Sequence, residues 1–456
     1  MLALLHLMSC VGTNEDKKYT YFGGKIKNPK GEYVYFSKGK KKLDSAKLDS
    51  HNKFYFKIDS LKLGLYTFNH GAEYQYLYLE PQDSLLIYLN TWDFDESLIF
   101  SGEGSAKNNY LINLYLQQEH TGKNFKSNYK LDEKEFSEVI EAGIKNQLDI
   151  YAEFLENEEE APSEFFDKMA KTGIYYPYYY FKEHYAYAHK RALGLKEEPV
   201  VSDEFYKYRE NIDLDDSSLI DYGLNIAFIN TYLYNLASSE KMKDPENKIF
   251  ELEFMKVVND KIPDENYKNN LLAKGAWGSL SNKNLSSEDA KVIQEFFFTN
   301  CSDNAYIAEL KISIAQKEKL KCGEALPKLT AVNFDNSEIE INSLMENANT
   351  VIYFWPTDLG AIELLNEKLN YLEKKHPDVL FIGIERNKSE QDWKKFVANK
   401  KLAKNKQFRI TKNSDQYSWF EGDMARTIIV NSKGEVENGY VFFQDSNLSY
   451  YLKSIN

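Results

Sequence analysis

The stretch that most constrains the fold of this chain is residues 351–363, with the sequence VIYFWPTDLGAIE. Its first five residues are β-branched or aromatic, a composition typical of a buried strand. The next residues, Pro356 to Gly360, predict a tight turn with a helix N-cap at Asp358. Apolar residues then recur three and four positions apart, from Ile362 to Leu372, which indicates a helix. The segment therefore predicts a strand, a sharp turn and a helix in immediate succession.

This segment resembles the active-site region of thioredoxin-like proteins of the TlpA/ResA type. In that family F-W-A-T-W-C-x-x-C places two cysteines at the start of the helix. Phe354, Trp355 and Thr357 match the motif, but Leu359 and Ile362 replace the cysteines. Because thiol–disulfide exchange needs a thiolate as the attacking group, the site is expected to be redox-inactive, with no catalytic residue.

A second departure from the family lies at Ala425. Thioredoxin-like proteins place a cis-proline opposite the dithiol, in a run like P-R-T-I-L-I-D-x-x-G. Residues 425–434, ARTIIVNSKG, correspond to that run, and Ala425 stands where the proline would be. A cis bond before a residue other than proline costs about 2.5–4 kcal/mol, so we expect a trans peptide and a reshaped groove. Apolar residues in place of the cysteines favour docking of a partner protein. The predicted docking surface consists of Trp355, Asp358, Leu359, Ile362, Ala425 and Arg426.

Charge and motif content argue against several other classes of protein. A net charge of −13 argues against nucleic acid as a partner, because phosphate binding needs a basic surface. No phosphate-binding loop, dinucleotide fingerprint or G-x-S-x-G motif occurs in the sequence. His184 and His189 are five residues apart, which does not suit a helical metal site. We therefore expect no cofactor, no metal and no enzymatic activity.

The N-terminus indicates a lipid anchor. Residues 1–10, MLALLHLMSC, are apolar and end in a lipobox, which predicts a signal peptide and lipidation of Cys10. A buried N-terminal strand is the alternative. Residues 11–18 would then be a polar tether, and the protein would be an outer-membrane lipoprotein, either periplasmic or surface-exposed.

Three further regions follow the tether. Residues 19–105 carry short aromatic or β-branched runs separated by turn residues, which predicts an all-β sandwich. This region also resembles an N-terminal β domain of unknown function in Bacteroidota lipoproteins, on pieces such as Tyr78-Leu79-x-Pro81-x-Asp83. Residues 106–321 have helical periodicity and predict an all-α middle domain, and residues 322–456 carry the resemblance to the thioredoxin-like α/β fold.

The aromatic run YYPYYYF at residues 175–181 allows two interpretations. It predicts a helix that begins at Pro177 and packs its rings between helices, or rings that stack on a ligand. Cys301 and Cys322 likewise allow two interpretations, because an oxidising compartment favours a disulfide between them whereas separate thiols remain possible.

Three functions are compatible with these observations. The favoured hypothesis is a redox-inactive thioredoxin-like lipoprotein that acts as a protein-binding or accessory subunit in the cell envelope, for instance of an outer-membrane complex. Its partners would be the membrane, through the lipid, and an envelope protein. The alternatives are a thiol–disulfide oxidoreductase that uses Cys301 or Cys322, and a glycan- or peptide-binding lipoprotein that uses the tyrosine-rich β domain.

Overall fold

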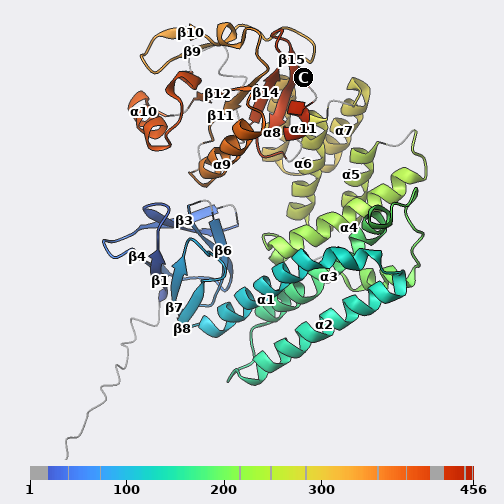
Figure 1. Cartoon of the computed structure of the whole chain (residues 1–456). Coiled ribbons are helices and arrows are strands. Elements are labelled where there is room, and N and C mark those ends of the chain that lie inside the picture. Colours follow the sequence, from blue (N-terminus) through green and yellow to red (C-terminus); the bar gives the residue numbers. More distant parts are fainter. Residues whose placement is uncertain are drawn as a thin grey trace, which may run out of the picture. The chain divides into compact units, whose positions relative to one another are not determined.

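The computed structural model describes residues 19–39, 41–71, 73–214, 217–246, 249–282, 285–356, 359–386, 388–410, 426–445, 448–453 and 455 (Figure 1). The chain forms two compact units, Met1–Asn235 and Leu236–Asn456. The region predicted as one helical domain, residues 106–321, is therefore divided between the two units.

The first unit begins with a β-sandwich, as the short aromatic and β-branched runs predict. One sheet has the strand order β4-β1-β7-β8 and the other has the order β3-β2-β5-β6. Inward-facing phenylalanines of both sheets, such as Phe22 and Phe68, share one core. The strands are β1 (Tyr19–Lys27), β2 (Tyr33–Lys38), β3 (Lys41–Lys47), β4 (Lys53–Asp59), β5 (Gly64–His70), β6 (Glu73–Leu79), β7 (Ser84–Asn90) and β8 (Ile99–Glu103).

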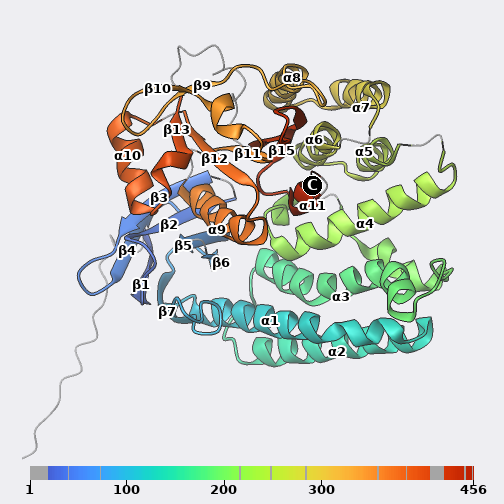
Figure 2. The same ribbon diagram turned by 45° about the horizontal axis from the view of Figure 1, so that its top comes forward.

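Helices complete this unit, and Figure 2 shows α1, α2 and α3 running beside one another. Their apolar side chains form a second core with Leu65 and Tyr78 of the sandwich. The helical elements are α1 (Ser105–Asn124), η2 (Phe125–Lys130), α2 (Glu133–Glu156), α3 (Glu164–Leu193), η3 (Glu204–Asn211), η4 (Ser217–Leu219) and α4 (Gly223–Met242), whose last turns belong to the second unit.

Helix α3 corrects the prediction that a helix begins at Pro177. The helix begins at Glu164, where the Ser163 hydroxyl accepts a hydrogen bond from the Phe166 N–H, and Pro177 lies in its interior. Proline has no N–H to donate to the carbonyl four residues earlier, which is that of Gly173. Gln118 of α1 donates its side-chain N–H to this carbonyl instead, at 3.4 Å. A neighbouring helix thus satisfies the group that the proline leaves open.

The second unit combines a helical group with a mixed sheet. The helices are α5 (Phe250–Lys261), α6 (Glu265–Ser281), α7 (Ser287–Asn300) and α8 (Asn304–Glu318), and α6 packs against the last strand of the sheet. The sheet has the order β10-β9-β13-β12-β11-β14-β15. Its strands are β9 (Thr330–Val332), β10 (Glu338–Glu340), β11 (Thr350–Phe354), β12 (Leu380–Glu385), β13 (Gln407–Arg409), β14 (Arg426–Val430) and β15 (Val436–Phe442).

The connections in this sheet agree with the predicted thioredoxin-like fold. Strand β11, helix α9 (Leu359–Lys375) and the parallel strand β12 form a βαβ unit. Strands β14 and β15 are antiparallel and precede helix α11 (Leu448–Lys453). The remaining helical elements are η5 (Ile341–Met345), η6 (Lys404–Lys406) and α10 (Glu390–Asn399), which Ser389 caps. Alternate residues of β11 face different cores, with Tyr353 toward α9 and Phe354 toward the opposite face.

Candidate functional site

The predicted docking surface lies at the end of β11, where Trp355 follows the strand directly. Only 1 % of Trp355 is exposed. Its ring packs edge-on against Tyr353 and Phe396, at centroid distances of 5.3 and 5.0 Å, and its indole N–H donates to the Gln407 side-chain oxygen at 3.0 Å. Gln407 in turn donates to the Tyr353 hydroxyl at 2.9 Å. Trp355 therefore holds β11 to its neighbours and presents no surface to a partner.

Ile362 and Arg426 are buried as well, which corrects their assignment to an exposed surface. Ile362 lies on the side of α9 that packs into the core beneath the sheet. The Arg426 guanidinium donates to the Gln316 side-chain oxygen at 2.5 Å and lies 4.9 Å from the centre of the Tyr440 ring. Burial lowers the pKa of Arg426 to about 10. Asp358, Ala425 and the side chain of Leu359 lie outside the described residues.

Of the two interpretations of Cys301 and Cys322, the structure agrees with separate thiols, because both cysteines are free. Cys301 is buried at the end of α7, where its Sγ lies 3.8 Å from the backbone oxygen of Asp303. Cys322 is exposed, and its Sγ donates to the backbone oxygen of Glu437 at 3.2 Å. Burial raises the pKa of Cys301, so this thiol is a poor nucleophile at neutral pH.

His184 and His189, whose spacing does not suit a helical metal site, each lie next to a backbone oxygen. The Nδ1 atom of His184 lies 3.1 Å from the Tyr180 oxygen, and that of His189 lies 2.9 Å from the Tyr129 oxygen. Within the described part of the chain, no group of three or more His, Cys, Asp or Glu side chains could hold a metal ion.

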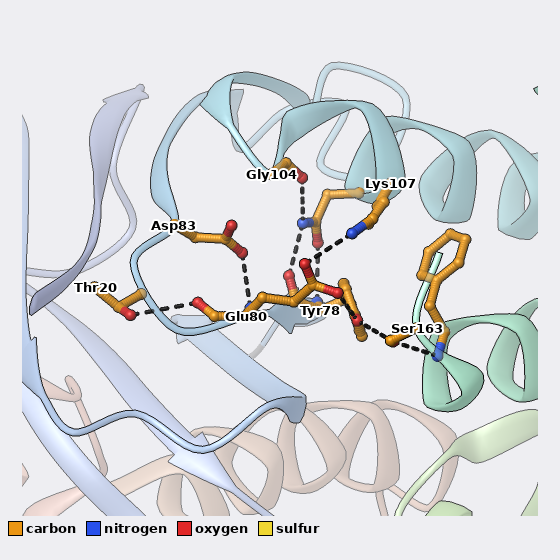
Figure 3. Close-up of polar contacts among 9 residues, drawn as sticks. Thr20, Tyr78, Glu80, Asp83, Gly104, Lys107 and Ser163 are labelled. Carbon is orange, nitrogen blue, oxygen red and sulfur yellow. Dashed lines mark hydrogen bonds and ion pairs between the residues drawn. The ribbon is translucent and has the colours of Figure 1, made fainter. Parts of the chain in front are cut away.

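A polar network joins the end of β6 to helices α1 and α3 (Figure 3). The Glu80 carboxylate accepts hydrogen bonds from the Tyr78 hydroxyl and from the Lys107 ammonium, the latter at 2.8 Å. Tyr78 also contacts the Ser163 hydroxyl at 2.6 Å, and Ser163 caps α3. These hydrogen bonds connect the end of β6 to α1 and to the start of α3, so the network attaches both helices to the sandwich.

Asp83 lies beside this network, below the start of α1 (Figure 3). Its carboxylate accepts a hydrogen bond from the Glu80 backbone N–H at 2.8 Å, and only 6 % of the residue is exposed. The Asp83 carboxylate fits here only because residue 104 is glycine: a Cβ atom at Gly104 would lie 2.7 Å from the carboxyl carbon of Asp83. Burial, followed by the nearby charge of Glu80, raises the pKa of Asp83 to about 6.

A second buried polar cluster surrounds Glu183 of α3. Arg209 donates two hydrogen bonds to its carboxylate, at 2.8 and 2.5 Å, and Tyr208 donates a third at 2.6 Å. The Asn235 side-chain amide donates a fourth, at 2.5 Å. The carboxylate is fully buried and accepts four hydrogen bonds, so it connects η3 and α4 to α3.

A cavity of about 190 Å³ lies inside the first unit, between the sandwich and the helices. Four tyrosines from three parts of the chain line it, together with aliphatic side chains such as Leu111 and Met169. These tyrosines are Tyr74 and Tyr76 of β6, Tyr115 of α1 and Tyr222 before α4. The sequence does not locate this cavity. Its only related signal is the high tyrosine content, which does not tell which tyrosines come together.

Comparisons with known proteins concern part of the chain. No protein-family model matches the sequence, and a search of curated proteins finds no similar sequence. Solved structures similar to about 30 % of the chain include the thioredoxin domain of a thiol-disulfide oxidoreductase from Bacteroides vulgatus, with 17 % identity over 99 % of that chain and a TM-score of 0.27. Another is a thiol:disulfide interchange protein from Bacteroides sp., with 18 % identity over 89 % of that chain and a TM-score of 0.24.

A third similar structure is a secreted Mycobacterium tuberculosis disulfide oxidoreductase, with 14 % identity, 28 % of this chain covered, 96 % of that chain covered and a TM-score of 0.24. At these identities and TM-scores the similarity does not extend to activity. Among the described residues, no helix is both long enough and apolar enough to cross a membrane.

Proposed function

We propose that this protein is a redox-inactive, thioredoxin-like lipoprotein of the bacterial cell envelope that binds a partner protein. The observation that carries the proposal is the start of α9, where the sequence has Leu359 and Ile362 at the positions that hold cysteines in thioredoxin-like relatives. Ile362 is 1 % exposed and belongs to the core, so this position supports the fold. Neither side chain can form the thiolate that disulfide exchange requires.

The remaining thiols give little support to the oxidoreductase alternative. Cys301 is buried with a raised pKa, and Cys322 is exposed on a different segment. Reduction of insulin by the full chain tests this part of the proposal. We expect no activity above buffer, whereas activity that is lost in Cys301→Ser or Cys322→Ser would overturn it.

Membrane attachment through Cys10 is the second part of the proposal. It can be tested by feeding cells a labelled fatty acid and recovering the protein. We expect label in the natural protein and none in Cys10→Ala, and equal labelling of the two would refute attachment at this residue.

Partner binding can be tested on α9 itself. The first residue of α9 is Leu359, and Leu364 on the same helix is 48 % exposed. We expect Leu359→Asp to reduce stoichiometric recovery of an envelope protein with the tagged chain, while Leu364→Asp leaves it unchanged. Recovery of the chain alone from gently solubilised envelopes would argue against a stable partner.

A further inference from the structure

The tyrosine-lined cavity of the first unit has the size of a small-molecule site. Its volume of about 190 Å³ exceeds that of an engineered protein cavity of about 150 Å³ that binds benzene. It lies where β6, α1, α3 and the start of α4 meet, so residues far apart in the sequence enclose it. A single aromatic ring with a short side chain fits this space.

The ring planes of the lining tyrosines form perpendicular walls. The ring of Tyr76 stands at 84° to that of Tyr74 and at 77° to that of Tyr222, with centroid distances of 5.7 and 5.4 Å. The Tyr76 hydroxyl accepts the Gly223 N–H at 2.8 Å and donates to the Asp221 oxygen at 3.1 Å. These contacts fix the walls in place before any ligand arrives, which lowers the entropic cost of binding.

Other polar groups that line the cavity are also engaged. The Asn108 side chain bonds the backbone N–H and C=O of Tyr78, at 2.9 and 2.7 Å. Gln75 accepts the Tyr76 backbone N–H at 2.8 Å. The body of a ligand would therefore meet apolar side chains and ring surfaces, which favours an apolar or aromatic body.

The charge next to the cavity is negative. Asp95 accepts a hydrogen bond from the lining residue Gln75 at 2.9 Å, and its charge acts on the Tyr115 hydroxyl. Glu96, Glu119 and Glu73 are close enough to Asp95 to affect it electrostatically, and Glu73 and Glu119 each form an ion pair with a lysine. Asp95 is half-buried, and no lysine or arginine of the described residues forms an ion pair with it.

We infer that this cavity binds a small organic amine, with its aromatic or apolar body between the tyrosines and its ammonium group directed toward Asp95, the carboxylate behind the lining residue Gln75. Tyrosine rings attract cations through their π-faces, and a carboxylate forms a strong charge-assisted hydrogen bond to an ammonium group. An anionic ligand of the same size would meet the negative charge of Asp95 and its three acidic neighbours. The inference concerns the first unit and does not depend on the proposed function.

The test uses the full chain and three probes of nearly equal size. These are 2-phenylethylamine, 2-phenylethanol and phenylacetate, which carry a positive group, a neutral group and a negative group on the same ring. Isothermal titration calorimetry gives their affinities, and a rise in melting temperature provides a second readout. We expect the amine to bind at least about 10-fold more tightly than the alcohol, since a hydrogen bond to a charged group contributes about 1.5–3 kcal/mol. Phenylacetate should not bind.

Two matched variants locate the ammonium group. Asp95→Asn keeps an oxygen that can accept the Gln75 hydrogen bond but removes the charge, so we expect a loss of at least about 10-fold in affinity for the amine. Asp93→Asn removes an exposed carboxylate two residues earlier and should leave the affinity unchanged.

Equal binding of the amine and the alcohol would overturn the inference, as would the absence of amine binding at millimolar concentration. Unchanged amine affinity in Asp95→Asn would also overturn it. The comparison of the three probes on the natural protein tests the inference even if a variant does not fold.

Discussion

Replacing Asp83 with asparagine should stabilise this protein at neutral and alkaline pH. The buried carboxyl accepts one backbone hydrogen bond, from the Glu80 N–H, and an asparagine oxygen can accept the same bond. The folded state raises the pKa of Asp83 from 3.8 to about 6, so it holds the proton more tightly than the unfolded chain does. The stabilising contribution of the protonated form is thus complete below pH 3.8 and is lost as the pH rises through about 6.

The size of the effect follows from the shift in pKa. Each pKa unit corresponds to about 1.36 kcal/mol, so ionisation of Asp83 should lower the free energy of unfolding by up to about 3 kcal/mol. Asparagine carries no charge at any pH and avoids this loss. We therefore expect Asp83→Asn to raise the free energy of unfolding by up to about 3 kcal/mol at pH 8 and to change it little at pH 4.

Urea unfolding of both proteins at pH 4, 6 and 8 measures the difference. Asp93→Asn serves as the control, since it removes an exposed carboxylate from the same sandwich and should change stability by no more than about 0.5 kcal/mol at each pH. The reasoning is refuted if Asp83→Asn is less stable than the natural protein at pH 8. A difference of the same size at pH 4 and pH 8 would also refute it.

Three further predictions test the packing of both units. Gln407→Leu should lower the free energy of unfolding by about 2–4 kcal/mol, measured by urea titration, because both of its buried partners lose a hydrogen bond; a change below about 0.5 kcal/mol would contradict this. Glu183→Ala should lower the free energy of unfolding by about 3–5 kcal/mol in the same assay, because it leaves the Arg209 guanidinium without its carboxylate. Replacing the exposed Glu138 with alanine should change it little. Iodoacetamide should alkylate Cys322 in the native protein and Cys301 only after unfolding, as seen by peptide mapping; protection of both thiols would indicate a disulfide.

Local sequence patterns predicted much of the second unit. The apolar run before Pro356 is strand β11, and the spacing from Ile362 onward is the buried side of α9. The start of α10 is local as well, because a serine followed three residues later by an acidic residue is typical of a helix N-terminus, and the Ser389 hydroxyl accepts the Asp392 N–H at 3.1 Å. These features depend on neighbours in the chain, which a single sequence contains.

The errors concern contacts between distant residues. The resemblance to thioredoxin-like proteins predicts Trp355 on a surface, but its partners Phe396 and Gln407 come from later segments and bury it. The sequence predicts that Pro177 starts a helix, yet the side chain of Gln118 satisfies the carbonyl that the proline leaves open. The sequence contains no local signal for such long-range partners.

Strand β15 is the last strand of its sheet, and its outer edge is not free. Gly323 and Glu324 pair with it, since the Gly323 N–H donates to the Val436 oxygen and the Val436 N–H donates to the Glu324 oxygen, both at 2.8 Å. Further along, Asn438 donates to the backbone oxygen of Ser281 at the end of α6, and Gly439 lies against Leu320. A shortened protein cut at the predicted boundary of residue 322 would lose α6 and Leu320 and would uncover backbone groups able to pair with other chains. Helix α6 and Leu320 after α8 therefore protect this edge of the sheet from pairing with other chains, and a fragment that keeps them should begin near residue 236.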